Sequence, residues 1–134
     1  MPETQMRAFD HLAKNPQDTD MIERLAARPP EEVIPQIPAL LECLQDINWP
    51  IAGAALPILM RYGVQTAQAV RPLLNAEQHD DVWKYWLVEA LFPQLPPDAR
   101  DMLTPFVRRI ADQPAPGERA EEVDRAAREQ LERI

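Results

Sequence analysis

Two histidines and one cysteine are the side chains of this sequence that could most readily bind a metal ion or attack a substrate. His11 and His79 lie far apart, and neither has a cysteine or a second histidine at the spacing of a metal site. Cys43 lies beside Leu44 in an apolar stretch, and its acidic neighbour Glu42 opposes the thiolate form that a nucleophile needs. We therefore expect a buried structural thiol, no metal centre and no cofactor.

The adjacent carboxylates of Asp80 and Asp81 could in principle act as a catalytic pair, but they also precede an apolar segment. Aspartate is a preferred helix N-cap, and a second acid in the first turn is stabilised by the helix dipole. The sequence has no glycine-rich phosphate loop, no nucleophile elbow and no HExxH motif. The pair is therefore predicted to begin a helix, and the chain is predicted not to be an enzyme.

The tryptophans are the strongest candidates for contact with a partner. Trp49, Trp83 and Trp86 are expected to pack between helices, because large aromatic residues at helical spacing usually belong to the core. If one ring is partly exposed, the cluster around Lys84 would instead form a binding hot spot. The candidate contact residues, which include two turn residues before Trp49, are Asp46, Asn48, Asp80, Asp81, Trp83, Lys84 and Trp86.

The charge of the chain limits the classes of partner that it could bind. The net charge is −8 and the isoelectric point is about 4.7, so the surface repels the phosphates of nucleic acids. Such a surface suits a basic protein partner, although acidity also serves solubility alone. We expect a protein partner and no nucleic acid, and the solubility interpretation stays open.

Length and composition favour a single helical domain over residues 1–134. The chain has three glycines and fifteen prolines, a balance that suits helices with short, stiff connections better than a β fold. A single cysteine excludes an internal disulfide and favours a reducing compartment. No apolar run is long enough for a membrane span, and the first residues lack the apolar region of a signal peptide. We therefore expect a cytoplasmic protein.

Prolines and cap residues divide the chain into expected helices. Pro35 and Pro38 interrupt one apolar pattern, so that helix either begins near Pro35 or is kinked. Pro57 should bend another helix, Gly63 should end it, and residues 113–117 should form a linker. The expected helices cover residues 4–14, 21–26, 30–44, 49–60, 64–74, 81–92, 98–110, with Asp98 as a cap, and about 118–133.

Two markers repeat along the chain with nearly the same period. Trp49 and Trp83 are 34 residues apart, and so are Pro38 and Pro72, whereas Pro105 follows Pro72 after 33 residues. A period of this length in helix pairs indicates an α-solenoid. The predicted fold is an all-α, HEAT-like α-α superhelix of about three helix pairs with a capping C-terminal helix.

Two segments resemble a family of small bacterial helical domains of unknown function. The residues that carry the resemblance are the stretch QDINWPIA at 45–52 and the stretch DVWKYW at 81–86, and the match runs from about residue 10 to the end. The resemblance implies a compact HEAT-like domain and no established activity. It leans towards immunity-type proteins, which bind and neutralise bacterial toxins.

These observations together predict a non-catalytic binding protein of the immunity type, with a basic toxin domain as its partner. Its acids should form a negative rim, because successive turns of a solenoid stack along one edge. The acids that contribute to it form two clusters, Glu31, Glu32, Glu42 and Asp46 around the first helix pair and Glu77, Asp80 and Asp81 before the second tryptophan helix. Of these, Asp46 and the Asp80–Asp81 pair should lie near each other on the rim. One alternative is a scaffold or adaptor without a toxin partner. A weaker alternative is a helical-repeat enzyme that modifies nucleic acids, for which the chain lacks a basic surface.

Overall fold

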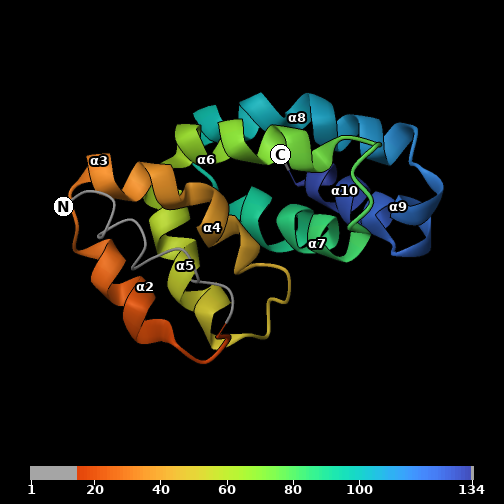
Figure 1. Ribbon diagram of the computed structural model, residues 1–134. Coiled ribbons are helices and arrows are strands. Elements are labelled where there is room, and N and C mark those ends of the chain that lie inside the picture. Colours follow the sequence, from red (N-terminus) through yellow and green to blue (C-terminus); the bar gives the residue numbers. More distant parts are fainter. Residues whose placement is uncertain (1–14, 134) are drawn as a thin grey trace.

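The computed structural model describes residues 15–133, and helices are the only regular secondary structure in that range (Figure 1). The prediction of an all-α chain is thus confirmed. The expected helix over residues 4–14 lies outside the described residues. None of the helices within residues 15–133 is long and apolar enough to cross a membrane.

The first helix pair is shaped by prolines. Helix α2 covers Thr19–Ala26 and ends before Pro29. The next helix is broken into α3 (Pro30–Val33), the 3-10 turn η1 (Ile34–Gln36) and α4 (Ile37–Glu42). Of the two expected outcomes the kink is therefore the observed one. Proline has no N–H for the helical hydrogen bond, and its ring displaces the preceding turn, so the α-helical pattern is interrupted here.

The second pair consists of α5 (Pro50–Arg61) and α6 (Gly63–Val70), extended by the 3-10 turn η2 (Arg71–Leu74). Gly63 does not end α5 in a left-handed conformation, because no described glycine has a positive φ. Instead Gly63 is the first residue of α6, and a Cβ there would lie 2.5 Å from Cγ of Pro96. The glycine is needed for this close approach.

The third pair consists of α7 (Asp81–Trp86) and α8 (Pro97–Asp112), separated by the π-helical segment η3 (Leu87–Leu91) and the 3-10 turn η4 (Phe92–Gln94). The expectation that Asp98 caps α8 is wrong. Pro96 occupies the N-cap position and Pro97 begins the helix, because a proline at that position loses no helical hydrogen bond.

The C-terminal region differs most from the expected linker and single helix. Helix α9 covers Pro116–Ala120, which takes in the last two residues of the expected linker and the start of the expected helix, and α10 covers Val123–Glu132. Between them Glu122 adopts a left-handed conformation with φ 62°, which ends one helix before the next begins. The side chain of Glu118, which faces the interior, anchors α9 as a separate element.

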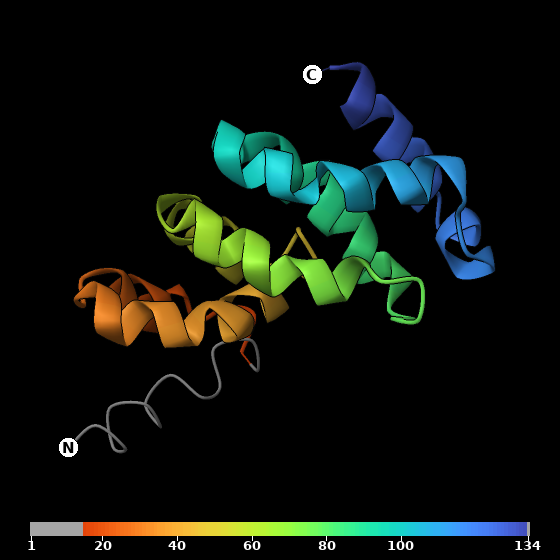
Figure 2. The same ribbon diagram turned by 90° about the horizontal axis from the view of Figure 1, so that it is seen from above.

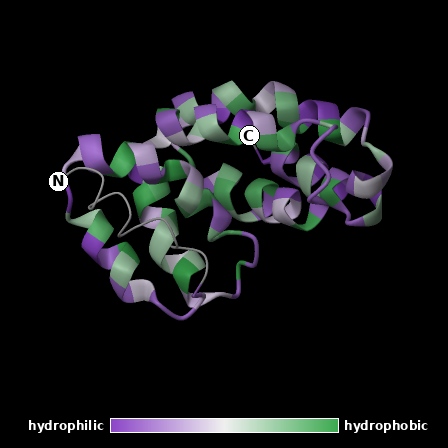
Figure 3. Cartoon of the chain, in the orientation of Figure 1, coloured by the Kyte–Doolittle hydropathy of each residue, from purple (hydrophilic) through white to green (hydrophobic). Residues whose placement is uncertain are grey.

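The helices pack in two layers around one apolar core. Helices α4, α6 and α8 lie side by side in one layer (Figure 2), and α2 packs on α5 beneath them (Figure 1). Helix α10 packs against α8 and η3 at the other end of the molecule. Apolar and polar residues alternate along the helices (Figure 3), and fully buried side chains such as Leu25, Leu59 and Leu103 fill the space between the layers.

Candidate functional site

Helix α7 begins as the sequence predicts. The Oδ1 atom of Asp80 accepts a hydrogen bond of 3.1 Å from the backbone N–H of Trp83, which satisfies one free donor of the first turn. Asp81 follows as an acid within that turn. The N-cap interpretation of Asp80 is therefore confirmed, and its side chain remains exposed to solvent.

Lys84 is inside the protein, with only 1% of its surface exposed. Its Nζ donates hydrogen bonds of 2.8 Å to the carbonyl oxygen of Asn75 and to Oε2 of Glu118. The interpretation of Lys84 as a contact residue therefore needs correction, since a partner cannot reach this side chain in the present conformation. Its chemical role is to join α7 to the turn after η2 and to α9.

Glu118 is completely buried between two cations. Arg109 of α8 donates to both carboxylate oxygens, at 2.5 Å to Oε1 and 2.8 Å to Oε2, and also donates to the carbonyl oxygen of Leu74 at 2.7 Å. Burial alone would raise the pKa of Glu118, but the hydrogen bonds from Arg109, Lys84 and the Ala115 amide outweigh it and lower the pKa to about 2. Lys84, Arg109 and Glu118 are called the buried ion cluster below.

Asp81 lies at the edge of the buried ion cluster rather than on the open surface. Its side chain is 13% exposed, and its Oδ1 lies 3.6 Å from Nζ of Lys84. That oxygen is buried and has no hydrogen-bond partner among the described residues. A Cβ on Gly117 would overlap with the Asp81 carboxylate, so this glycine allows the acid to lie against α9. Asp81 is therefore a weaker contact candidate than Asp80.

The tryptophans lie between the two roles proposed for them, because all three are partly buried, and Trp49 and Trp83 pack against the core. Nε1 of Trp83 donates a hydrogen bond of 2.9 Å to the carbonyl oxygen of Leu41, which joins α7 to α4. Trp86 packs edge-on against Tyr85 with ring centroids 5.0 Å apart. Each ring stabilises the fold, and Trp83 and Trp86 retain surface for contact with a partner.

Asp46 and Asn48 form the turn that precedes α5. Oδ1 of Asp46 accepts a hydrogen bond of 2.9 Å from the backbone N–H of Asn48, and its carbonyl oxygen accepts from Trp49 N–H at 3.1 Å. Their role as turn residues is confirmed. Asn48 is exposed and Asp46 is half-buried, so both side chains are accessible to a partner.

Six of the seven acids expected to form a negative rim divide into two groups, and the seventh, Asp46, is half-buried in its turn. Glu32 receives two hydrogen bonds from Nη2 of Arg28, and Asp81 turns inward. The other group consists of exposed side chains that take part in none of the ion pairs between residues 15 and 133. These residues, called the exposed acids below, are Glu31, Glu42, Glu77 and Asp80. Their assembly into one rim stays a prediction.

Cys43 is fully buried, as the sequence predicts. Burial, together with the nearby Glu42 carboxylate, raises the pKa of its thiol to about 12. The thiolate is therefore scarce at neutral pH, which makes Cys43 a structural residue. Within residues 15–133 no three His, Cys, Asp or Glu side chains converge on a position where they could hold a metal ion, and His11 lies outside that range.

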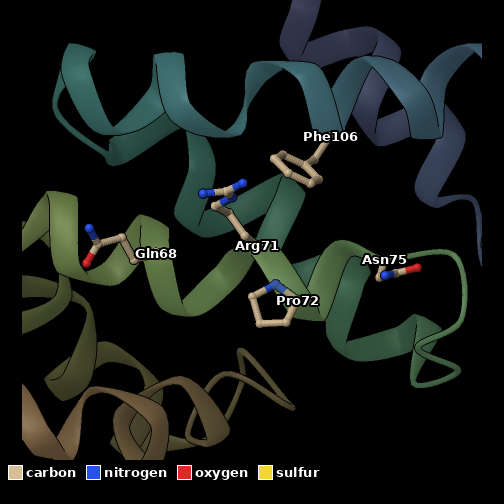
Figure 4. Close-up of a pocket in the computed structure, with 5 residues that line it drawn as sticks. All are labelled: Gln68, Arg71, Pro72, Asn75 and Phe106. Atoms are coloured by element: carbon tan, nitrogen blue, oxygen red, sulfur yellow. The ribbon is translucent and has the colours of Figure 1, made fainter.

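A shallow hollow of about 350 Å³ lies between η2 and α8 (Figure 4). Gln68, Arg71, Pro72 and Asn75 line one side, and Phe106 of α8 lines the other. The guanidinium carbon of Arg71 lies 5.3 Å from the centre of the Phe106 ring. This combination of a cation, an aromatic ring and two amides can bind a carboxylate and the backbone beside it.

Sequence reasoning missed both the hollow and the acid of the buried ion cluster. Glu118 follows the Pro116–Gly117 pair, which indicates a loop, and its partner Lys84 is 34 residues away in sequence. The sequence does contain a signal for the hollow. Alignment of Pro38 with Pro72 places Arg71 where the earlier unit has an apolar residue, and that departure could have identified the position.

A family model described as "Domain of unknown function (DUF5071)" matches residues 11–131, which is most of the chain. The search of curated proteins gives no match to the chain.

Proposed function

Because the chain belongs to the DUF5071 family of domains of unknown function, we propose a function from its geometry: a non-catalytic protein that binds and neutralises a bacterial toxin domain. The observation that carries the proposal is the group of exposed acids. Glu42 ends α4, and Glu77 and Asp80 lie in the turn before α7, so they are placed on connections rather than within packed faces.

The arrangement of the helices supports a HEAT-like superhelix as the frame for this binding surface. Helices α4, α6 and α8 follow one another in one layer, each as the later helix of a pair, and α10 covers the end (Figure 2). In such an array the connections between helices fall along the edges. The turns that carry Asp46 and Asp80 then lie on one edge, where their charges add. A reducing, cytoplasmic location suits the single buried thiol of Cys43.

The exposed acids would act mainly on the rate at which the partner is captured. A basic partner is attracted to a negative surface before contact, which speeds association and orients the two proteins. Inhibition then needs no chemistry by this chain, because the chain, once bound, covers the substrate-binding surface of the toxin. Trp83 and Trp86, which are partly exposed on α7, would supply the apolar contact that slows dissociation.

The proposal predicts that reversing two exposed acids weakens protection against the toxin. Glu42→Lys combined with Glu77→Lys should need about tenfold more protein for the same protection, because encounter with a basic partner is slowed. The fold should tolerate both changes, since Glu42 lies at the C-terminus of α4, where a cation is favoured, and Glu77 is exposed. The measurement is growth of a host that co-expresses this chain with a candidate toxin domain of basic net charge.

A matched control separates surface position from total charge. Glu129→Lys combined with Glu132→Lys changes two exposed acids of α10, so both double variants carry a net charge of −4 instead of −8. The control should protect as the wild type does. Equal loss of protection in both variants would refute a localised acidic site. Binding without any protection would instead favour the scaffold or adaptor function.

A further inference from the structure

The hollow between η2 and α8 has a chemical character that differs from the exposed acids. Its cation, Arg71, is exposed, and none of the hydrogen bonds or ion pairs between residues 15 and 133 uses its side chain. The ring of Phe106 lies 5.3 Å from its guanidinium carbon, and Figure 4 shows the two side chains facing each other across the hollow. The N–H donors at the edge of the guanidinium plane are therefore available to a planar carboxylate.

The flanking groups extend this site in both directions. Gln68 precedes Arg71 by about one helical turn, and Asn75 follows at the other end of the same segment (Figure 4). Side-chain amides can both donate to and accept from a peptide backbone. Pro72 and Phe106 provide the apolar wall. The hollow is open to solvent, which suits a segment of a larger partner better than an enclosed small molecule.

Comparison with the preceding repeat unit indicates that the hollow is not required by packing. Pro38 and Pro72 mark equivalent positions, so Arg71 is the counterpart of Ile37, which is only 2% exposed. By the same alignment of Pro72 with Pro105, Phe106 is the counterpart of Leu73, which is partly buried against the core. The aliphatic residues Ile37 and Leu73 thus occupy the positions that Arg71 and Phe106 occupy one unit later. A cation at a position that accepts isoleucine points to binding.

We propose that the hollow binds an extended segment of a partner protein through one aspartate or glutamate side chain held by Arg71. The carboxylate receives two hydrogen bonds from the guanidinium. Gln68 bonds to the backbone on one side, and Asn75, whose Oδ1 already accepts a hydrogen bond from the Glu77 N–H, donates from its amide nitrogen on the other. An apolar residue next to the acid packs on Phe106 and Pro72. Because the chain carries a net charge of −8, a carboxylate of the partner needs a nearby cation to offset the repulsion, and Arg71 supplies that cation in the hollow. This inference does not depend on the toxin-binding proposal.

The test is a selection of random heptapeptides displayed on phage against the immobilised full chain. Enriched peptides should share one Asp or Glu beside an apolar residue, and replacing that acid by its amide should weaken binding at least about tenfold. Arg71→Ile, which introduces the residue of the equivalent position, should keep the fold and abolish binding. Arg71→Lys should weaken binding, because an ammonium group cannot form the planar two-point contact.

The control is Arg108→Gln, which removes an exposed arginine of α8 that does not line the hollow and should leave peptide binding unchanged. Enrichment of peptides without an acid, no enrichment at all, or equal binding to the wild type and Arg71→Ile would each overturn the proposal. The proposal would also be overturned if millimolar acetate displaced the peptide completely, because the hollow would then bind free carboxylates rather than a protein segment.

Discussion

Glu118→Gln is expected to lower the free energy of unfolding by about 3–5 kcal/mol at neutral pH, the usual cost of removing one partner from a buried ion pair. The substitution keeps the shape of the side chain but leaves Lys84, which is 1% exposed, without its closest anionic partner, so that only Asp81 remains, at 3.6 Å. It also removes the charge that Arg109 contacts through both carboxylate oxygens. Urea denaturation followed by circular dichroism measures the loss.

An exposed acid of the same region provides the matched control. Glu121→Gln, between α9 and α10, should change the free energy of unfolding by less than about 0.5 kcal/mol, as is usual for surface substitutions. A second variant, Lys84→Met combined with Glu118→Leu, removes the two charges that are fully buried. It should be more stable than Glu118→Gln, since no fully buried ammonium then lacks Glu118, whereas Arg109, whose side chain is 27% exposed, can still reach water. If Glu118→Gln unfolds like the wild type, the buried ion cluster does not hold α7, α8 and α9 together.

Glu118 also makes the free energy of unfolding depend on pH in the acidic range. The pKa of Glu118 in the folded state is about 2, below its ordinary value of 4.5, so folding favours the ionised form. Its contribution is fully present above pH 4.5 and is lost as the pH falls towards 2, a change of about 3 kcal/mol. Glu118→Gln should lack this part of the pH dependence when unfolding is measured across that range.

Trp83→Ala is expected to lower the free energy of unfolding by about 3 kcal/mol, the lower end of the range for a large aromatic residue, because the ring is only partly buried. The variant loses both the packing of the ring and its hydrogen bond to the carbonyl oxygen of Leu41. Since that bond joins α7 to α4, backbone amides in both helices should exchange hydrogen faster. Denaturation and hydrogen exchange measure the two effects.

Two variants separate the contributions of Trp83. Trp83→Phe keeps an aromatic ring and removes the N–H donor, so it should lose only about 1 kcal/mol. Val82→Ala changes the preceding residue, which is 47% exposed, and should have little effect. If Trp83→Ala is as stable as Val82→Ala, the ring contributes to a binding surface and not to the fold.

Features that depend on neighbours in sequence could be predicted. Asp80 caps α7 through an N–H three residues ahead, and the prolines at 35 and 38 break a helix by removing local hydrogen bonds. The burial of Cys43 follows from its apolar neighbours. Each of these properties is decided within one or two turns of the chain, and the all-α class follows from many such local preferences acting together.

Features that depend on distant contacts could not be predicted in the same way. The sequence predicts Lys84 to be a contact residue because it lies within the tryptophan cluster, but the acid that makes its burial possible is 34 residues away. The sequence predicts that Gly63 ends a helix, whereas the structure shows that a glycine is needed there because Pro96 packs against its Cα. The position of Arg71 opposite Phe106 likewise arises only when α8 packs beside η2.

The central claim is that the exposed acids capture a basic toxin domain. Its most direct test is the association rate constant of the purified chain with that domain, measured by stopped-flow fluorescence from about 0.02 M to about 0.5 M salt. The account predicts that Glu42→Lys/Glu77→Lys associates about tenfold more slowly than the wild type at low salt and that the difference vanishes at high salt, whereas Glu129→Lys/Glu132→Lys follows the wild type. Equal rates for all three proteins, or association that quickens as salt rises, would contradict it.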